Sequence, residues 1–279
     1  MPVWLAAARA VHYGACTGLF GLSLFQHYGS QPARFRAWLA GLGVAALISG
    51  AAWFALVTFD LAGGLDGPAL AAIVTQTSFG PVWLARLALA LAASLLIGLS
   101  PQGRRTVPGL LAGLLLASIA LTGHTQIHDG PLRAAHVVSD AIHLLAAGAW
   151  IGGLAGLILT LSPDAGPANA PTVGRFSQMG YLAVAGLIVS GLVNAAILVR
   201  SPANLIGSPY GRLLLLKLAL FAAMLFLAAA NRLLISPRLA GPNAASQVRA
   251  LRRNAAIEQG IALGVLVCVA FLGMGEPPG

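Results

Sequence analysis

The residues best suited to chemistry are histidines that lie inside or beside long apolar runs. In the run over 134–161, His136, Asp140 and His143 are spaced i, i+4 and i+7, so a helix places them on one face. The two imidazoles are then about 10 Å apart along the axis. We therefore expect an outer and a deeper metal ligand, with Asp140 able to orient either ring. The alternative is structural: a histidine at a helix end, and an Asp–Arg pair that holds helices together.

Two further groups combine imidazole with sulfur. His12 is followed one helical turn later by Cys16, and His124 and His128 are spaced i, i+4 where an apolar run ends. Imidazole with thiolate suits copper or zinc, and a thioether such as Met274 favours Cu(I). The histidines and the methionine are therefore candidate metal ligands, and Cys16 is a candidate to support them or to balance charge beside them. The alternatives are a backbone hydrogen bond for each imidazole, a surface histidine loop, and ordinary packing for the methionine.

Two cationic side chains, Arg86 and Lys217, also lie within apolar runs. Ionisable groups in hydrocarbon are costly, so each is a candidate for function. They could neutralise Asp140 or extend outward to the membrane surface, and we favour such a charge-partner role over a ligand role.

The composition excludes a soluble protein. The chain has 279 residues, of which 58% are hydrophobic and 8% charged, with a mean hydropathy of +0.86, whereas soluble domains carry about 25% charged residues. The net charge of +9 is typical of the cytoplasmic loops of a membrane protein and needs no nucleic acid. No phosphate-binding loop, HExxH or GxGxxG motif is present, so we expect no enzyme activity.

Long apolar runs predict an all-α, polytopic membrane protein, because about 20 apolar residues span a bilayer as a helix. We expect eight transmembrane helices, the first retained rather than cleaved as a signal peptide. Arg residues favour alternate loops by ten to three, which predicts that both termini are periplasmic and that the loops at 61–80 and 124–133 are external. The predicted helices cover 3–28, 36–60, 81–100, 106–124, 134–161, 176–199, 212–235 and 255–275.

The two halves of the sequence resemble each other. His12 and Gly21 recur as His143 and Gly152 at an offset of 131, and the Ser-Gly pair at 49–50 recurs at 190–191 at an offset of 141. We interpret the chain as two four-helix repeats of the same orientation, over 1–124 and 125–279. Such repeats are related by an axis along the membrane normal, so His12 and His143 are expected at equal depth, near a shared centre.

One set of residues carries a family resemblance. It comprises Gly123, His124, His143, residues 150–154, 175–177, 190–191, Asn194, 211–217, 231–232, Pro237 and Glu258, together with 77–80, Trp83 and Arg86. In these residues the chain resembles the CopD (PcoD) family, the inner-membrane copper resistance protein D of bacteria. The resemblance implies copper handling, with transport across the inner membrane and a small periplasmic copper-binding protein of the CopC type as a partner.

The sequence therefore predicts a copper-permeation protein without ATP hydrolysis, with Cu(I) favoured as the ion. Its candidate ligands are His12, His124, His128, His136, His143 and Met274. Two alternatives stay open. One is an electron-transfer protein with haem b between His12 and His143, and the other is a membrane scaffold for a periplasmic copper carrier.

Overall fold

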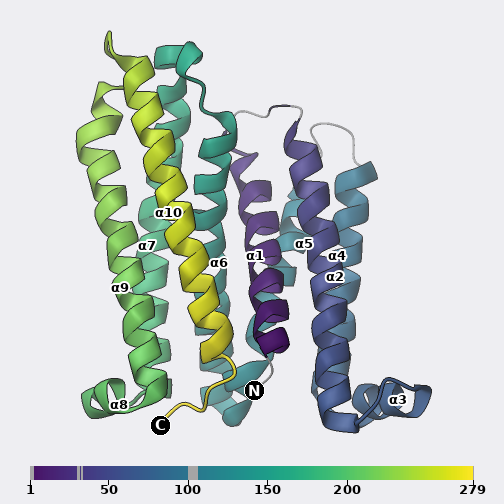
Figure 1. The fold of residues 1–279 in the computed structure, drawn as a ribbon. Coiled ribbons are helices and arrows are strands. Elements are labelled where there is room, and N and C mark those ends of the chain that lie inside the picture. Colours follow the sequence, from purple (N-terminus) through teal and green to yellow (C-terminus); the bar gives the residue numbers. More distant parts are fainter. Residues whose placement is uncertain (1–2, 30–31, 33, 100–105, 279) are drawn as a thin grey trace.

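The computed structural model describes residues 3–29, 32, 34–99 and 106–278, and these residues form helices and no strands. The long helices run side by side in one bundle (Figure 1). α1 (Val3–Phe25) and α6 (Gly130–Thr160) pack against each other. On one side lie α2 (Arg34–Ala62), α4 (Phe79–Leu99) and α5 (Thr106–Ala117), and on the other α7 (Ala170–Leu198), α9 (Pro209–Ala230) and α10 (Ala244–Leu272).

Six of the described helices are long and apolar enough to cross a membrane, namely α2, α4, α6, α7, α9 and α10 with their short extensions. This supports a multi-pass membrane protein. α1 is 23 residues long but contains Arg9, His12 and Tyr13, and it is not among the six. α5 has only 12 residues and continues as the 3-10 turn η1 (Ser118–Leu121). The number of eight membrane crossings therefore stays a prediction.

The segments that connect the long helices are more ordered than expected. The region 61–80, predicted as a loop, contains α3 (Gly67–Gln76), and a second short helix, α8 (Pro202–Gly207), precedes α9. Both have a proline within their first two residues and a capping side chain before them. Asp66 accepts from the amide of Ala69 at 2.9 Å, and Ser201 from that of Asn204 at 3.2 Å. Hydropathy did not predict α3, because a short helix that depends on capping side chains leaves no long apolar run.

The last helix is longer than its apolar run. α10 begins at Ala244 rather than near 255, because the polar segment before the run is helical too. α9 instead ends in a π-helical turn, η4 (Asn231–Ile235), followed by the 3-10 turn η5 (Ser236–Arg238). Turns of π type are rare and frequently occur at functional sites.

α1 and α6 approach closely where Gly21 meets Gly152. A Cβ atom added at Gly21 would lie 2.6 Å from the Cα of Gly152, and one at Gly152 would collide with the Gly21 backbone. Small residues allow membrane helices to pack at such short range. These two glycines are aligned by the predicted repeat, so equivalent positions meet at the contact between the two halves.

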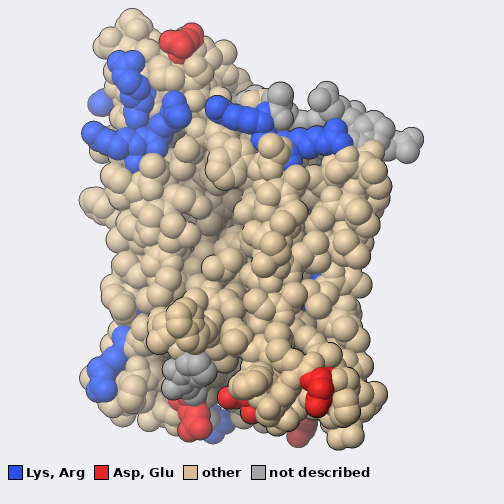
Figure 2. Space-filling view, turned by 45° about the vertical axis from the view of Figure 1, so that its right-hand side comes forward, with Lys and Arg blue, Asp and Glu red and all other residues tan. Residues whose placement is uncertain are grey.

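Charge is segregated between the two ends of the bundle. Most of the Lys and Arg side chains visible in Figure 2 gather at the end where α10 begins, and acidic side chains are more frequent at the opposite end. The start of α1, the end of α10, α3 and α8 all lie at this opposite end (Figure 1). Arg104 and Arg105, counted above with the predicted cytoplasmic set, lie outside the described residues.

Candidate metal-binding site

His128 and His136 form a pair of imidazoles near the start of α6. Their ring centroids are 5.7 Å apart. His136 is only 2% exposed. The Nε2 of His128 and the Nδ1 of His136 are both buried, and neither has a hydrogen-bond partner among the described residues. Unpartnered buried polar atoms are rare and call for an explanation such as an ion. Two nitrogens that bind one metal lie at most about 4 Å apart, a separation that these rings permit.

His124 lies close to this pair but is partly committed to another contact. It lies on the 3-10 turn η2 (Gly123–Ile127), and its Nε2 bonds the carbonyl of Leu272 at 3.0 Å. Because a carbonyl only accepts, Nε2 carries the hydrogen, and Nδ1 remains for a metal. Burial lowers the pKa of His124, although the Leu272 carbonyl opposes this. Its charge and that of His136 are close enough to interact.

Met274, the repeat counterpart of His124, lies in the turn that ends α10. Its amide donates to the carbonyl of Phe271 at 3.0 Å. It therefore lies at the same end of the bundle as His124, which bonds Leu272 of that segment.

His143 occupies the deeper position on the same face of α6. Its Nδ1 lies 2.9 Å from the hydroxyl of Ser190, and that hydroxyl donates to the carbonyl of Gly186 at 2.5 Å. The ring also interacts with the Leu187 carbonyl. Because the Ser190 hydrogen is already used, Nδ1 of His143 is the donor, and Nε2 keeps its lone pair. This is the arrangement found in metal-ligating histidines, whose other nitrogen donates to a protein oxygen.

Asp140 lies between the two histidines of α6. One of its oxygens accepts from the side-chain amide of Asn194 at 3.2 Å, while the Asn194 oxygen is buried and unpartnered within the described chain. The charge of Lys217 is close enough to interact with both Asp140 and His143. Of the two cations predicted as partners of Asp140, Lys217 is near enough to interact with it, whereas Arg86 bonds Ser118 and Thr122.

Arg86 instead forms hydrogen bonds with residues that follow α5 in the first half. It is fully buried, donates to the hydroxyl and carbonyl of Ser118 at 3.1 and 2.7 Å, and reaches the hydroxyl of Thr122 at 3.1 Å. Its guanidinium lies 4.1 Å from the ring centroid of Trp83. These contacts satisfy carbonyl and hydroxyl groups at the end of α5, which supports a structural role.

His12 lies in a closed aromatic environment. It is 0% exposed, and its ring centroid lies 5.8 Å from that of Trp53 and 5.9 Å from that of Trp83. Its Nδ1 contacts the Ala46 carbonyl and the Ser49 hydroxyl, both at 3.1 Å. Its Nε2 lies 3.6 Å from the sulfur of Cys16, so the expected proximity of these two residues is found.

The structure does not bring His12 and His143 together. His12 faces α2 and α4, whereas His143 faces Ser190 of α7. Each histidine precedes its crossing glycine, Gly21 or Gly152, by nine residues, which is two and a half helical turns. Both rings therefore point away from the contact between α1 and α6. A metal or haem bound jointly by this pair has no geometric support.

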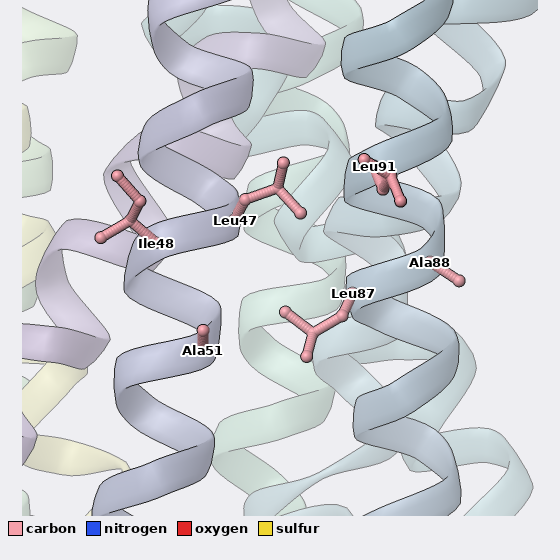
Figure 3. A pocket seen from close by; sticks show the side chains of 6 residues that line it. All are labelled: Leu47, Ile48, Ala51, Leu87, Ala88 and Leu91. Carbon is pink, nitrogen blue, oxygen red and sulfur yellow. The ribbon is translucent and has the colours of Figure 1, made fainter.

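The described residues contain no group of three or more His, Cys, Asp or Glu side chains placed to hold one metal ion together. A pocket of ≈ 450 Å³ is also unrelated to the histidines. It lies between α2 and α4 and is lined only by aliphatic side chains (Figure 3). It offers no donor atom to an ion. Leu47, Ile48, Ala51, Leu87, Ala88 and Leu91 line it.

The sequence did not identify Ser49 and Ser190 as histidine partners. Each follows its histidine in the next long helix, and each recurs at the offset of the repeat. This recurrence could have identified the two serines as hydrogen-bond partners, since buried histidines need such partners and a serine on an adjacent helix can supply one.

Taken together, the bundle is a helical, multi-pass membrane protein with buried, partly unpartnered histidines towards one end. Comparison with known proteins places it more closely. Residues 1–135 match the family model of the copper resistance protein D-like N-terminal domain, and residues 170–272 match that of copper resistance protein D. The chain is 32% identical to copper resistance protein D of Pseudomonas syringae pv. tomato over 97% of its own length and 96% of that protein. The chain belongs to the copper resistance protein D family.

Two other relatives extend this likeness. The inner membrane protein YebZ of Escherichia coli K12 is 31% identical, over 85% of each chain. The copper transport protein CutJ of Bacillus subtilis is 32% identical over 98% of this chain, which spans 53% of that longer protein. No solved structure matches the chain. The family and these relatives support a multi-pass inner membrane protein associated with copper.

Proposed function

We propose that this protein carries copper across the bacterial inner membrane without ATP hydrolysis, and that the ion enters at His128 and His136. One observation carries the proposal: two buried imidazole nitrogens on adjacent rings, centroids 5.7 Å apart, have no hydrogen-bond partner in the described chain. Imidazole is a good copper ligand, and two neutral imidazoles suffice for Cu(I). His124, through its Nδ1, and Met274 are the candidates for additional ligands at the same end.

The route would follow one face of α6. An ion released from His136 meets Asp140 and then the free Nε2 of His143, because these residues share a helix face. α2 packs against α4 in the first half, whereas α7 and α9 make no comparable contact in the second. The second half therefore leaves this face of α6 less covered by neighbouring helices. His12 remains a predicted ligand, but it lies outside this route.

The orientation follows from charge. The Arg-rich end would face the cytoplasm, and both termini and the histidine end the periplasm. We also infer eight membrane crossings in two four-helix repeats, over 1–124 and 125–279. The parallel His12–Ser49 and His143–Ser190 contacts, and the meeting of Gly21 with Gly152, support the duplication. A periplasmic carrier of the CopC type would deliver the ion to the histidine end.

Copper analysis of purified variants tests the entry site. His136→Ala and His128→Ala should each lower the bound Cu(I) by at least half, because a two-imidazole site cannot hold the ion with one ligand. His27→Ala is the matched control, since His27 is exposed and lies beyond the opposite end of α1. X-ray absorption of the loaded protein should show nitrogen ligands. Full copper occupancy in His136→Ala would refute the assignment.

A further inference from the structure

Glu258 is a buried carboxyl group that the copper route does not use. It lies on α10, is 1% exposed, and contacts Asn231 at the start of the π-helical turn η4. Its Oε1 accepts from the side-chain amide of Asn231 at 2.7 Å, while its Oε2 is buried and has no partner among the described residues.

The hydrogen bonds around Glu258 have a fixed direction. The amide of Asn254 donates to the Oδ1 of Asn231 at 2.7 Å, so the Asn231 amide must turn its own NH2 towards Glu258. Asn254 and Glu258 are four residues apart and share a face of α10. Asn231 is the first residue of the π-helical turn. Two side chains and an irregular turn thus hold one carboxylate oxygen in place and leave the other open.

Within the described residues, no cation is paired with this carboxyl group. Burial and the hydrogen bond from Asn231 act on it. The elements packed against α10 at its inner end carry Asp164 on η3 (Pro163–Asn169), Arg232 on η4 and Arg238 on η5. Arg249, Arg252 and Arg253 lie on α10 itself. None of these is paired with Glu258 in the described structure.

Ionisable groups on the remaining neighbours of α10 lie towards the other end of the bundle. They fall between Arg9 and Cys16 on α1 and between Arg133 and His143 on α6, and on α9 they are Tyr210, Arg212 and Lys217. A buried carboxylate without a counter-charge is costly, and a proton removes that cost. Arg253 precedes Glu258 by about 7.5 Å along the axis, so the group is close to the Arg-rich end.

We propose that Glu258 is a proton-binding site that exchanges its proton with the Arg-rich end of the bundle while copper passes. The carboxylate takes up one proton at its open Oε2 and later returns it, so no other reactant is required. Copper movement is then coupled to proton movement. This coupling rests on the proposed copper transport, whereas the protonation of Glu258 itself does not.

The sequence offers a clean measurement, because Glu276 is the only other glutamate and it is exposed. Carboxyl-labelled [13C]glutamate gives two carboxyl NMR signals from the whole chain, assigned with Glu258→Gln and Glu276→Gln. We expect the Glu258 signal to be that of a protonated acid at a pH where a free glutamate side chain is ionised. A Glu258 signal that titrates like that of a free glutamate side chain would overturn the proton site.

Proteoliposomes with a trapped pH dye test the coupling. Copper added to wild-type vesicles should produce a proton flux that falls at least tenfold in Glu258→Gln and is unchanged in Glu276→Gln. The copper site at His128 and His136 should keep full occupancy in Glu258→Gln, and this occupancy also reports correct folding of the variant. Proton flux that survives in Glu258→Gln would refute coupling through this residue. If wild-type vesicles move no copper, the proposed transport fails, and the NMR titration still decides the proton site.

Discussion

Ser190 and Ser49 allow the two deep histidines to be compared within one molecule. Each hydroxyl contacts the Nδ1 of its histidine, at 2.9 Å for His143 and 3.1 Å for His12, and each donates to a carbonyl of its own helix. Replacing either serine with alanine removes the same atoms from equivalent places. Each change should cost about 1 kcal/mol of stability, the usual net value of one such hydrogen bond.

The effects on copper should differ. Removing an outer partner of a ligating histidine lowers metal affinity by about 10- to 100-fold. The Leu187 carbonyl still interacts with the His143 ring, so we expect the lower end of this range for Ser190→Ala, about tenfold or 1.4 kcal/mol. Ser49→Ala should leave copper uptake unchanged, because His12 lies off the proposed route and keeps its contact with the Ala46 carbonyl.

Copper uptake into proteoliposomes, measured beside thermal unfolding in detergent, separates the two effects. Ser190→Ala should lose uptake without losing more stability than Ser49→Ala. Equal losses of uptake in both variants would show that the hydroxyls act only through stability. Unchanged uptake in Ser190→Ala would mean that His143 is not a ligand on the route.

Three further predictions concern packing, pH and charge. Gly152→Ala should lower stability by about 1–3 kcal/mol through overpacking, because the added Cβ would collide with the backbone of Gly21. The control Gly260→Ala should not lower stability, because a Cβ there meets nothing within 4 Å. Thermal unfolding of the two variants compares them. Burial lowers the pKa of His124, so the stability that it contributes is present above its unfolded value of about 6.5 and is lost as pH falls below that value. His124→Gln should flatten this decline, and parallel melting curves would contradict it. Asp140→Asn should keep the fold but reduce copper flux more than tenfold, since the charge of Lys217 is then uncompensated beside the route; unchanged flux would remove Asp140 from it.

Hydropathy alone predicted most of the bundle, because membrane helices must satisfy their backbone internally over a fixed length. Each of the eight predicted ranges overlaps a helix, although α5 ends at Ala117, before the predicted end at 124. The ends of α2 and α4 fall within two residues of the predicted bounds. Hydropathy missed α3 and α8, which depend on capping rather than on apolar runs. It also placed the start of α10 too late, since polar residues that continue a helix leave no hydropathy signal.

The site was less predictable for a geometric reason. Aligned positions in a repeat share depth, but the direction of each side chain depends on its angle around the helix. His12 and His143 were correctly found within helices, yet they face away from the contact of Gly21 with Gly152. The sequence also contained no sign that nitrogens of His128 and His136 lack partners, since this depends on how η2 brings His128 next to His136.

His12 and His143 are equivalent in the two halves, but the residues around them are not. Arg9 occupies the position that Asp140 holds in the second half, at the offset of 131, and Trp53 the position of Asn194, at the offset of 141. In the first half the Arg9 guanidinium lies 4.7 Å from the Trp53 ring centroid, and the Trp53 and Trp83 centroids are 4.6 Å apart.

This difference bears on the proposed copper route. Around His12, two guanidiniums, those of Arg9 and Arg86, lie on aromatic rings that already fill the space, and their positive charge opposes a metal ion. Around His143, Asp140 supplies a carboxylate and Asn194 an unpartnered oxygen. The charge of Lys217 interacts with Asp140, so the second half has one acidic and one basic group here, where the first half has two basic groups. Because Coulomb energies grow where water is excluded, this difference supports the proposed copper route through the second half.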